Sequence, residues 1–198
     1  MAGIHPMAIR GPWVDGYALD YHTISSTYVG DNEFGHPVFD TQRTALGELL
    51  FRLKSRSDHS VVNEIVEAVA RFVESTWKPR LTIIVPVPPS NTARRAQPVF
   101  VLADALGKRL RLQVRHDAVA KIRKTPQLKN VYDYAERAKV LEGAFRVDST
   151  VVRDQSILLF DDLYRSGATM NAVAKVLSAE GQAETVHALA LTRTWRRR

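Results

Sequence analysis

The chain has 198 residues, of which 45% are hydrophobic and 25% are charged, proportions typical of one globular domain. It contains no apolar run of the roughly 20 residues that a membrane helix needs, no fixed-period repeat and no low-complexity segment. The absence of cysteine excludes disulfides, thiolate nucleophiles and Cys-ligated zinc. The first residues do not resemble a secretory signal, so we expect a soluble cytoplasmic protein with no membrane partner.

The positive charge of the chain is concentrated in two places. The net charge is +7, from 28 Lys and Arg against 21 Asp and Glu. Residues 94–139 hold 12 basic and 4 acidic residues, a net charge of +8, while the four arginines of segment 193–198 add +4 and the remainder sums to −5. Local basicity predicts an anionic partner, which is a nucleic acid, a membrane surface or a phosphorylated metabolite.

The first 60 residues show fewer clear signals than the rest. Residues 17–29 resemble a strand, residues 30–32 favour a turn, and residues 41–53 have the leucine spacing of a helix. We therefore treat residues 1–40 as an N-terminal extension, which serves either as a hood over a site or as an interface.

From Ser60 onward the chain alternates between helix-like and strand-like segments. Helices are predicted from Ser60 to Lys78, from Pro98 to Leu110 and from Thr169 to Gly181. Strands are predicted at residues 81–85, 112–114, 144–147, 156–160 and 185–191, and a polar basic loop is predicted from Lys121 to Lys139. This order predicts an α/β fold with a Rossmann-like parallel sheet of mixed edge, flanked by helices, with ligands at the carboxyl ends of the strands.

One segment, residues 157–170, combines acidic residues with a phosphate-binding turn. A buried strand is followed by Asp161 and Asp162, and then by the sequence Ser166-Gly167-Ala168-Thr169 at the start of a helix. Gly167 permits a tight turn, and the amides at a helix start bind phosphate oxygens. Two carboxylates beside a phosphate are favourable if the ligand also carries hydroxyls, as a ribose does, or brings a divalent cation. The alternative is a strand end followed by an ordinary helix cap.

The same string resembles the phosphoribosyl pyrophosphate (PRPP) motif of type I phosphoribosyltransferases, and within that superfamily the ComF-like proteins. Further similarity lies in Ile84-Val-Pro-Val-Pro88, in Arg123-Lys-Thr-Pro-Gln127, in residues 136–145 and in the early helix of Leu49–Lys54. The resemblance implies a type I phosphoribosyltransferase fold for residues 41–192, with the N-terminal addition before it and a basic tail, residues 193–198, after it. Arg165 stands where the family usually has a small hydroxyl residue.

The resemblance also implies a role for each part of the site. Asp161 and Asp162 would bind the ribose hydroxyls. Mg²⁺ would bind mainly through PRPP, and no direct protein ligand is assigned beyond these two candidate carboxylates. The 5-phosphate loop would be Arg165, Ser166, Gly167, Ala168 and Thr169. The pyrophosphate loop would be Val87, Pro88, Pro89, Arg94 and Arg95. The flexible loop would be Lys121, Arg123, Lys124, Gln127 and Arg137.

The implied activity is transfer of the 5-phosphoribosyl group from PRPP to an unknown acceptor, nucleobase-like or other, with release of pyrophosphate. Two alternatives remain open: a ComF-like protein of DNA uptake that binds single-stranded nucleic acid, and a nucleotide-binding regulator without turnover. The resemblance also allows a homodimer.

Two residues outside these motifs are further candidates. His22 is either an acceptor-site base or a structural histidine. Trp195, between Arg193 and the terminal arginines, is either a stacking residue for single-stranded nucleic acid or part of a frayed terminus.

Overall fold

The computed structural model describes residues 3–89, 97–123 and 134–195 of the chain. The strands are β1 (Met7–Ala8), β2 (Asp15–Tyr21), β3 (Thr23–Asp31), β4 (Pro37–Arg43), β5 (Ile83–Pro86), β6 (Gln113–Val114), β7 (Val119–Lys121), β8 (Phe145–Val147), β9 (Ser156–Tyr164) and β10 (Thr185–Arg193). The helices are α1 (Ala45–Arg56), α2 (Val62–Arg71), which continues as a π-helical segment over Phe72–Trp77, α3 (Pro98–Leu110), α4 (Tyr134–Leu141), α5 (Ser149–Val152) and α6 (Ala168–Ala179).

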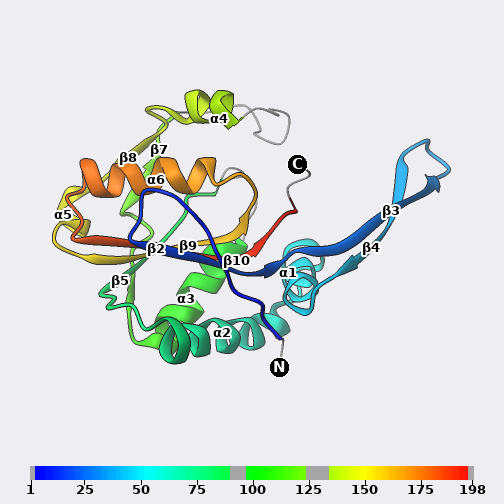
Figure 1. Cartoon of the computed structure of the whole chain (residues 1–198), viewed down its shortest axis with the longest axis horizontal. Helices are drawn as coiled ribbons and strands as arrows, with labels where there is room; N and C mark the ends of the chain where they lie inside the picture. The colour runs from blue at the N-terminus through cyan, green and yellow to red at the C-terminus, as the bar shows by residue number, and fades with distance from the viewer. Residues whose placement is uncertain (1–2, 90–96, 124–133, 196–198) are drawn as a thin grey trace.

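The centre of the molecule is a six-stranded sheet in the order β1-β2-β10-β9-β5-β6 (Figure 1). Strands β2, β10, β9, β5 and β6 pair in parallel, and β1 pairs antiparallel with β2 at one edge. The α/β fold class, a largely parallel sheet of mixed edge flanked by helices, is therefore confirmed. Because the inner strands are parallel, their carboxyl ends meet at one edge of the sheet.

Both faces of the sheet are covered, which explains why its central strands are uninterrupted apolar runs. On β9, Ile157 and Leu159 lie in the core cluster beneath α6, and Leu158 and Phe160 lie in the cluster beneath α1, α2 and α3. Figure 1 shows α6 on one side of the sheet and α2 and α3 on the other. None of the helices within these described residues is long and apolar enough to cross a membrane.

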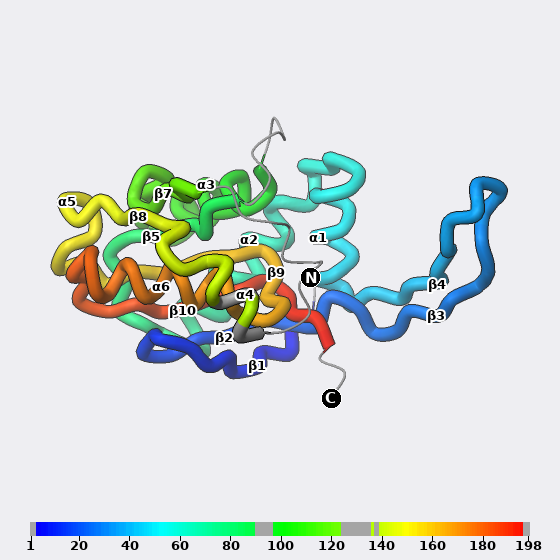
Figure 2. The backbone as a smooth tube through the Cα atoms, turned by 90° about the horizontal axis from the view of Figure 1, so that it is seen from above, coloured from blue at the N-terminus to red at the C-terminus, as the bar shows by residue number. Residues whose placement is uncertain are grey.

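The N-terminal residues contribute to the central sheet and also form a projecting hairpin. The strand predicted for residues 17–29 is broken at His22 into β2, which lies beside β10, and β3. Strands β3 and β4 pair only with each other, and Figures 1 and 2 show this hairpin extending away from the body of the molecule. We refer to residues 23–43 as the β-arm.

Several boundaries differ from the sequence prediction. The helix predicted for residues 41–53 is observed as α1, Ala45–Arg56, because residues 41–43 pair with β3 as part of β4. The predicted loop from Lys121 to Lys139 is wrong at its end, because α4 begins at Tyr134. The polarity of this helix conceals it, and among its residues with described side chains the buried apolar one is Leu141, at its end. Strand β9 continues past Phe160 to Tyr164, because its ladder with β10 continues through the polar residues.

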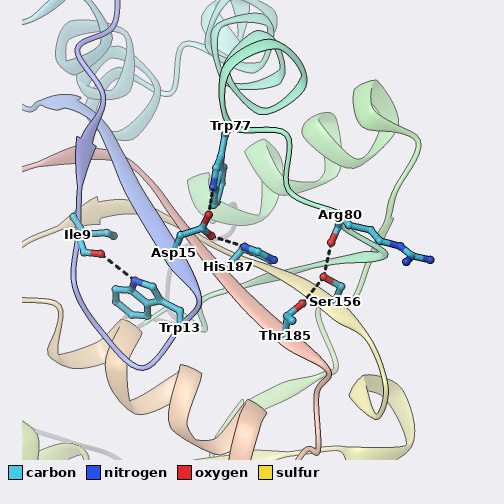
Figure 3. A network of polar contacts seen from close by, with 8 residues as sticks. All are labelled: Ile9, Trp13, Asp15, Trp77, Arg80, Ser156, Thr185 and His187. Atoms are coloured by element: carbon cyan, nitrogen blue, oxygen red, sulfur yellow. Dashed lines mark hydrogen bonds and ion pairs between the residues drawn. The ribbon is translucent and has the colours of Figure 1, made fainter.

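A cluster of polar contacts fixes the amino ends of the strands, at the edge opposite to the carboxyl ends (Figure 3). The Asp15 carboxylate accepts a hydrogen bond from Trp77 Nε1 at 2.6 Å and contacts His187 Nδ1 at 2.5 Å. The Ser156 hydroxyl lies 2.5 Å from the Thr185 hydroxyl and also contacts the Arg80 carbonyl oxygen. These contacts join β2, β9 and β10 to the end of the π-helical segment, so His187 has a structural role.

Candidate functional site

The carboxyl ends of β5 and β9 bring two of the predicted site segments together. The amide of Val87, directly after β5, donates a hydrogen bond of 2.8 Å to the Phe160 carbonyl oxygen on β9. Val87, Pro88 and Pro89 therefore leave the sheet beside Asp161. The turn at residues 165–167 follows β9 directly and leads into α6. The strand, carboxylate pair, turn and helix predicted from residues 157–170 are all present.

The turn before α6 brings the first amides of the helix to the carboxyl edge of the sheet. Gly167 caps the helix with φ of 79°, a left-handed conformation that glycine adopts without strain. Its carbonyl oxygen accepts a hydrogen bond of 2.8 Å from the amide of Asn171, and the amide of Ala168 lies 3.4 Å from the Ser166 hydroxyl. The first amides of a helix attract an anion because they lack partners in the preceding turn and carry the positive end of the helix dipole.

Tyr164, the last residue of β9, packs against this turn. A Cβ atom placed on Gly167 would lie 2.4 Å from the Tyr164 hydroxyl, so no side chain fits there without displacing the ring. The tyrosine hydroxyl also lies 3.5 Å from the Arg10 carbonyl oxygen in the segment between β1 and β2. Tyr164 therefore joins the turn to the N-terminal part of the chain, a contact that the sequence motif did not predict.

The two adjacent carboxyl groups have different environments. Burial and the neighbouring Asp162 carboxylate raise the pKa of Asp161 to about 8, although the amide of Asp162 donates to Asp161 Oδ1 at 2.8 Å. Asp162 instead pairs with Lys54 Nζ at 2.9 Å. Successive strand residues point to opposite faces, so Asp162 reaches the face that carries α1. One carboxyl group is thus protonated at neutral pH while the other is held in an ion pair.

Lys54 reaches the site because α1 packs very closely against the end of β2. A Cβ atom on Gly47 would lie 2.1 Å from the carbonyl oxygen of His22. Gly47 and Lys54 are seven residues apart and share one helix face. Thr44 fixes the start of the same helix, since its hydroxyl accepts from the Gly47 amide and donates to the Tyr21 carbonyl oxygen at 2.6 Å.

His22 lies between β2 and β3 and is connected to the backbone of Asp162 through Thr192. Its Nδ1 is 3.2 Å from the Thr192 hydroxyl, which in turn lies 3.4 Å from the Asp162 carbonyl oxygen. Burial, followed by the charges of Lys54 and Arg43, lowers the pKa of His22, against the opposing charge of Asp162. His22 is therefore a neutral imidazole beside the site at pH 7.

The basic residues predicted to bind pyrophosphate are only partly described. Arg94, Arg95, Lys124 and Gln127 lie outside the described residues, as does the Arg137 side chain. Arg123 donates to the carbonyl oxygens of Val140 and Glu142 at 2.9 and 2.6 Å, which ties it to the end of α4. Burial lowers the pKa of Lys121.

Part of the basic segment is engaged in local ion pairs. Arg109 pairs with Glu67 and Glu74, and Arg115 pairs with Asp117. The net charge of residues 94–139 therefore overstates the positive charge that is free to attract a ligand.

The carboxylate pair is suited to a magnesium ion that is shared with a substrate. No cluster of three or more His, Asp or Glu side chains able to hold a metal occurs among residues 3–89, 97–123 and 134–195. Mg²⁺ commonly binds through one or two carboxylates together with substrate phosphates and water. Asp161 and Asp162 supply carboxyl oxygens of the type that Mg²⁺ binds, but Asp161 must first lose its proton and Asp162 must leave Lys54 before they can hold the implied ion.

Comparison with known proteins agrees with the resemblance that the motifs showed. No protein family model matches the chain. Its sequence is 24% identical over 160 residues to the competence protein ComFC of Bacillus subtilis, an alignment that covers 78% of this chain and 62% of that protein. The predicted ComF-like character is confirmed, and the chain spans about three-fifths of the length of this relative.

Similar solved structures include two adenine phosphoribosyltransferases. The enzyme from Thermoanaerobacter pseudethanolicus is 15% identical with a TM-score of 0.46, and the match covers 85% of this chain and 95% of that one. The enzyme from Saccharomyces cerevisiae is 11% identical with a TM-score of 0.46, and the match covers 85% of each chain.

Proposed function

We propose that the protein binds PRPP with Mg²⁺ and transfers its 5-phosphoribosyl group to a nitrogen acceptor, releasing pyrophosphate. The observation that carries this proposal is the position of Asp161 and Asp162 directly before the glycine turn that opens α6. A ligand at this edge would meet hydroxyl-binding carboxylates and a phosphate-binding turn side by side, which matches a ribose 5-phosphate.

Each part of the site has a role in binding. The amides at the start of α6, with the hydroxyls of Ser166 and Thr169, would hold the 5-phosphate. The carboxylates would accept hydrogen bonds from the two ribose hydroxyls, which requires Asp161 to lose its proton and Asp162 to loosen its pair with Lys54. The residues after Val87 would face the pyrophosphate. Mg²⁺ would supply charge neutralisation of the polyphosphate.

The reaction exchanges one bond at the anomeric carbon for another. The bond between that carbon and the pyrophosphate oxygen breaks with its electron pair leaving on pyrophosphate, and the lone pair of the acceptor nitrogen forms the new bond. The nitrogen then loses its proton. We assign His22 as the acceptor of this proton, because its lowered pKa leaves the ring neutral at pH 7.

The test is pyrophosphate release from PRPP with Mg²⁺ in the presence of a panel of free nucleobases. We expect release with at least one acceptor, a loss of at least 100-fold in Asp161→Asn with Asp162→Asn, and a smaller loss in His22→Gln. Asp58→Asn is the matched control, since Asp58 lies beside Arg52 at the end of α1 and outside the site. PRPP binding without release by any acceptor would refute the transfer step and leave a binding protein.

A second candidate function, binding of single-stranded nucleic acid, is supported by an aromatic surface at the end of β10. The rings of Tyr21 and Trp195 stack at 3.7 Å with an interplanar angle of 3°, and Trp195 is 59% exposed. Stacking on an exposed aromatic ring beside basic residues is a common means of binding single strands. We expect affinity for an oligonucleotide to fall with salt and in Trp195→Ala. Affinity that is independent of both would refute this candidate.

A further inference from the structure

The β-arm exposes a large apolar surface that no other part of the described chain covers. Strands β3 and β4 form a separate two-stranded sheet, and Figure 2 shows the arm projecting well beyond the body. Phe34 at its tip is 73% exposed and Tyr28 is 54% exposed. The other large apolar side chains exposed on it are Ile24, Val29, Val38 and Phe39.

The arm is nevertheless built to hold its shape. Tyr28 and Phe39 are direct cross-strand partners whose rings meet edge to face at 5.8 Å, and the Tyr28 hydroxyl donates to Asp31 at 2.9 Å. The Asn32 side chain accepts from the amides of Phe34 and His36 at 3.0 Å, which fixes the turn. A two-stranded hairpin alone is marginally stable in water, and a contiguous exposed apolar patch marks an interaction surface.

The charge of the arm indicates which surface covers it. The arm, residues 23–43, contains Asp31, Glu33 and Asp40 against the single basic residue Arg43, a net charge of −2, so the rest of the chain carries +9. Two arms would repel each other, and an acidic arm also disfavours nucleic acid and anionic lipid. The basic body of another copy of this chain has the complementary charge.

We propose that the β-arm docks on the body of a second copy of this chain and forms a symmetric dimer in which each arm holds the other copy. In such an interface each copy contributes its own arm of about twenty residues and also the surface that receives its partner's arm. Together these two surfaces reach the roughly 20–30 residues that each side of a stable interface contains. The arm begins at Thr23, directly after His22, whose Nδ1 lies 3.2 Å from the Thr192 hydroxyl, so the dimer contact starts near the candidate site. The inference does not depend on the proposed activity.

Sedimentation equilibrium of the full chain tests this proposal. We expect a dimer whose dissociation constant rises at least tenfold in Phe34→Ser with Val29→Ser, two exposed side chains outside the Tyr28–Phe39 pair, and rises again as salt is increased to about 0.5 M, where charges are screened beyond about 4 Å. Val14→Ser is the matched control, because Val14 is also exposed and apolar but lies outside the arm, and it should leave the constant unchanged.

Folding of the variants is checked by far-ultraviolet circular dichroism, which should not change, because the substituted side chains are exposed. A wild-type protein that stays monomeric at high concentration would overturn the proposal, as would a dimer that is insensitive to the arm variant. Association that strengthens with salt would also overturn it, because that result indicates apolar pairing of one arm with another.

The absence of cysteine gives a second, independent readout. A nitroxide label on His36→Cys, in the exposed turn of the arm, should lose mobility on dimer formation, while a label on Arg153→Cys on the body should serve as the exposed reference. A label in the arm turn that stays equally mobile in monomer and dimer contradicts docking of the arm.

Discussion

The carboxyl group of Asp161 makes the free energy of unfolding of the ligand-free protein depend on pH. Its pKa is raised from the usual 3.8 to about 8 by burial and by Asp162. Between these two pH values the unfolded chain is ionised at this residue while the folded protein retains the proton. Because the folded state binds more protons, its stability falls as pH rises through this window and levels off above about pH 8.

The size of this change in stability follows from the pH interval between the two pKa values. Within it, each pH unit changes the free energy of unfolding by about 1.4 kcal/mol, so the change between pH 5 and pH 7 is about 3 kcal/mol. Asparagine cannot ionise, so Asp161→Asn removes the contribution of this residue to the pH dependence of stability. We therefore expect Asp161→Asn to gain about 3 kcal/mol relative to wild type between pH 5 and pH 7.

The assay is urea unfolding of both proteins at pH 5, 6 and 7 without ligand, extrapolated to zero denaturant. Asp58→Asn is the matched control. Hydrogen bonds from Ser60 and then Arg52 lower the pKa of Asp58 to about 2, so its ionisation is the same in both states above pH 5. A stability difference between Asp161→Asn and wild type that is equal at pH 5 and pH 7 would refute this account of the site.

Three further substitutions test other contacts. Lys54→Met should lower stability by about 1–3 kcal/mol in chemical denaturation, because it leaves the largely buried Asp162 carboxylate unpaired, and no loss would mean that the ion pair contributes nothing. Gly167→Ala should lower the free energy of unfolding by about 1–3 kcal/mol, measured as a lower Tm, because position 167 has a positive φ and a methyl group there meets Tyr164. The control Gly3→Ala should leave the Tm unchanged, because Gly3 has open space around it. Asp58→Asn should remove a stability contribution that wild type retains above about pH 4 and loses as pH falls towards 2; identical acid unfolding curves would contradict it.

The sequence predicted those segments whose amino-acid pattern matches the burial and backbone conformation of the same residues in the folded protein. The run from Ile157 to Phe160 is apolar because both faces of β9 are covered, and a glycine between Ser166 and Ala168 marks the turn that precedes α6. In these segments, the local sequence specifies a buried strand and a glycine turn before a helix.

Other features depend on contacts between distant residues, which a sequence pattern does not contain. The pairing of Lys54 with Asp162 joins positions 108 residues apart and requires both the strand order and the close approach of Gly47. The only local signal was a cation on the buried face of a leucine-rich helix. The start of strand β2 was missed for a related reason, since Asp15 is polar but is held there by contacts with the distant residues Trp77 and His187.

The central claim is that PRPP binds at the carboxylate pair and the turn that opens α6. Isothermal titration of PRPP with Mg²⁺ into wild type, into Asp161→Asn with Asp162→Asn, and into the Asp58→Asn control tests it most directly. The account predicts saturable binding at one site per chain in wild type and in the control, weakened at least 100-fold in the double variant. No binding by wild type, or equal binding by the double variant, would contradict it.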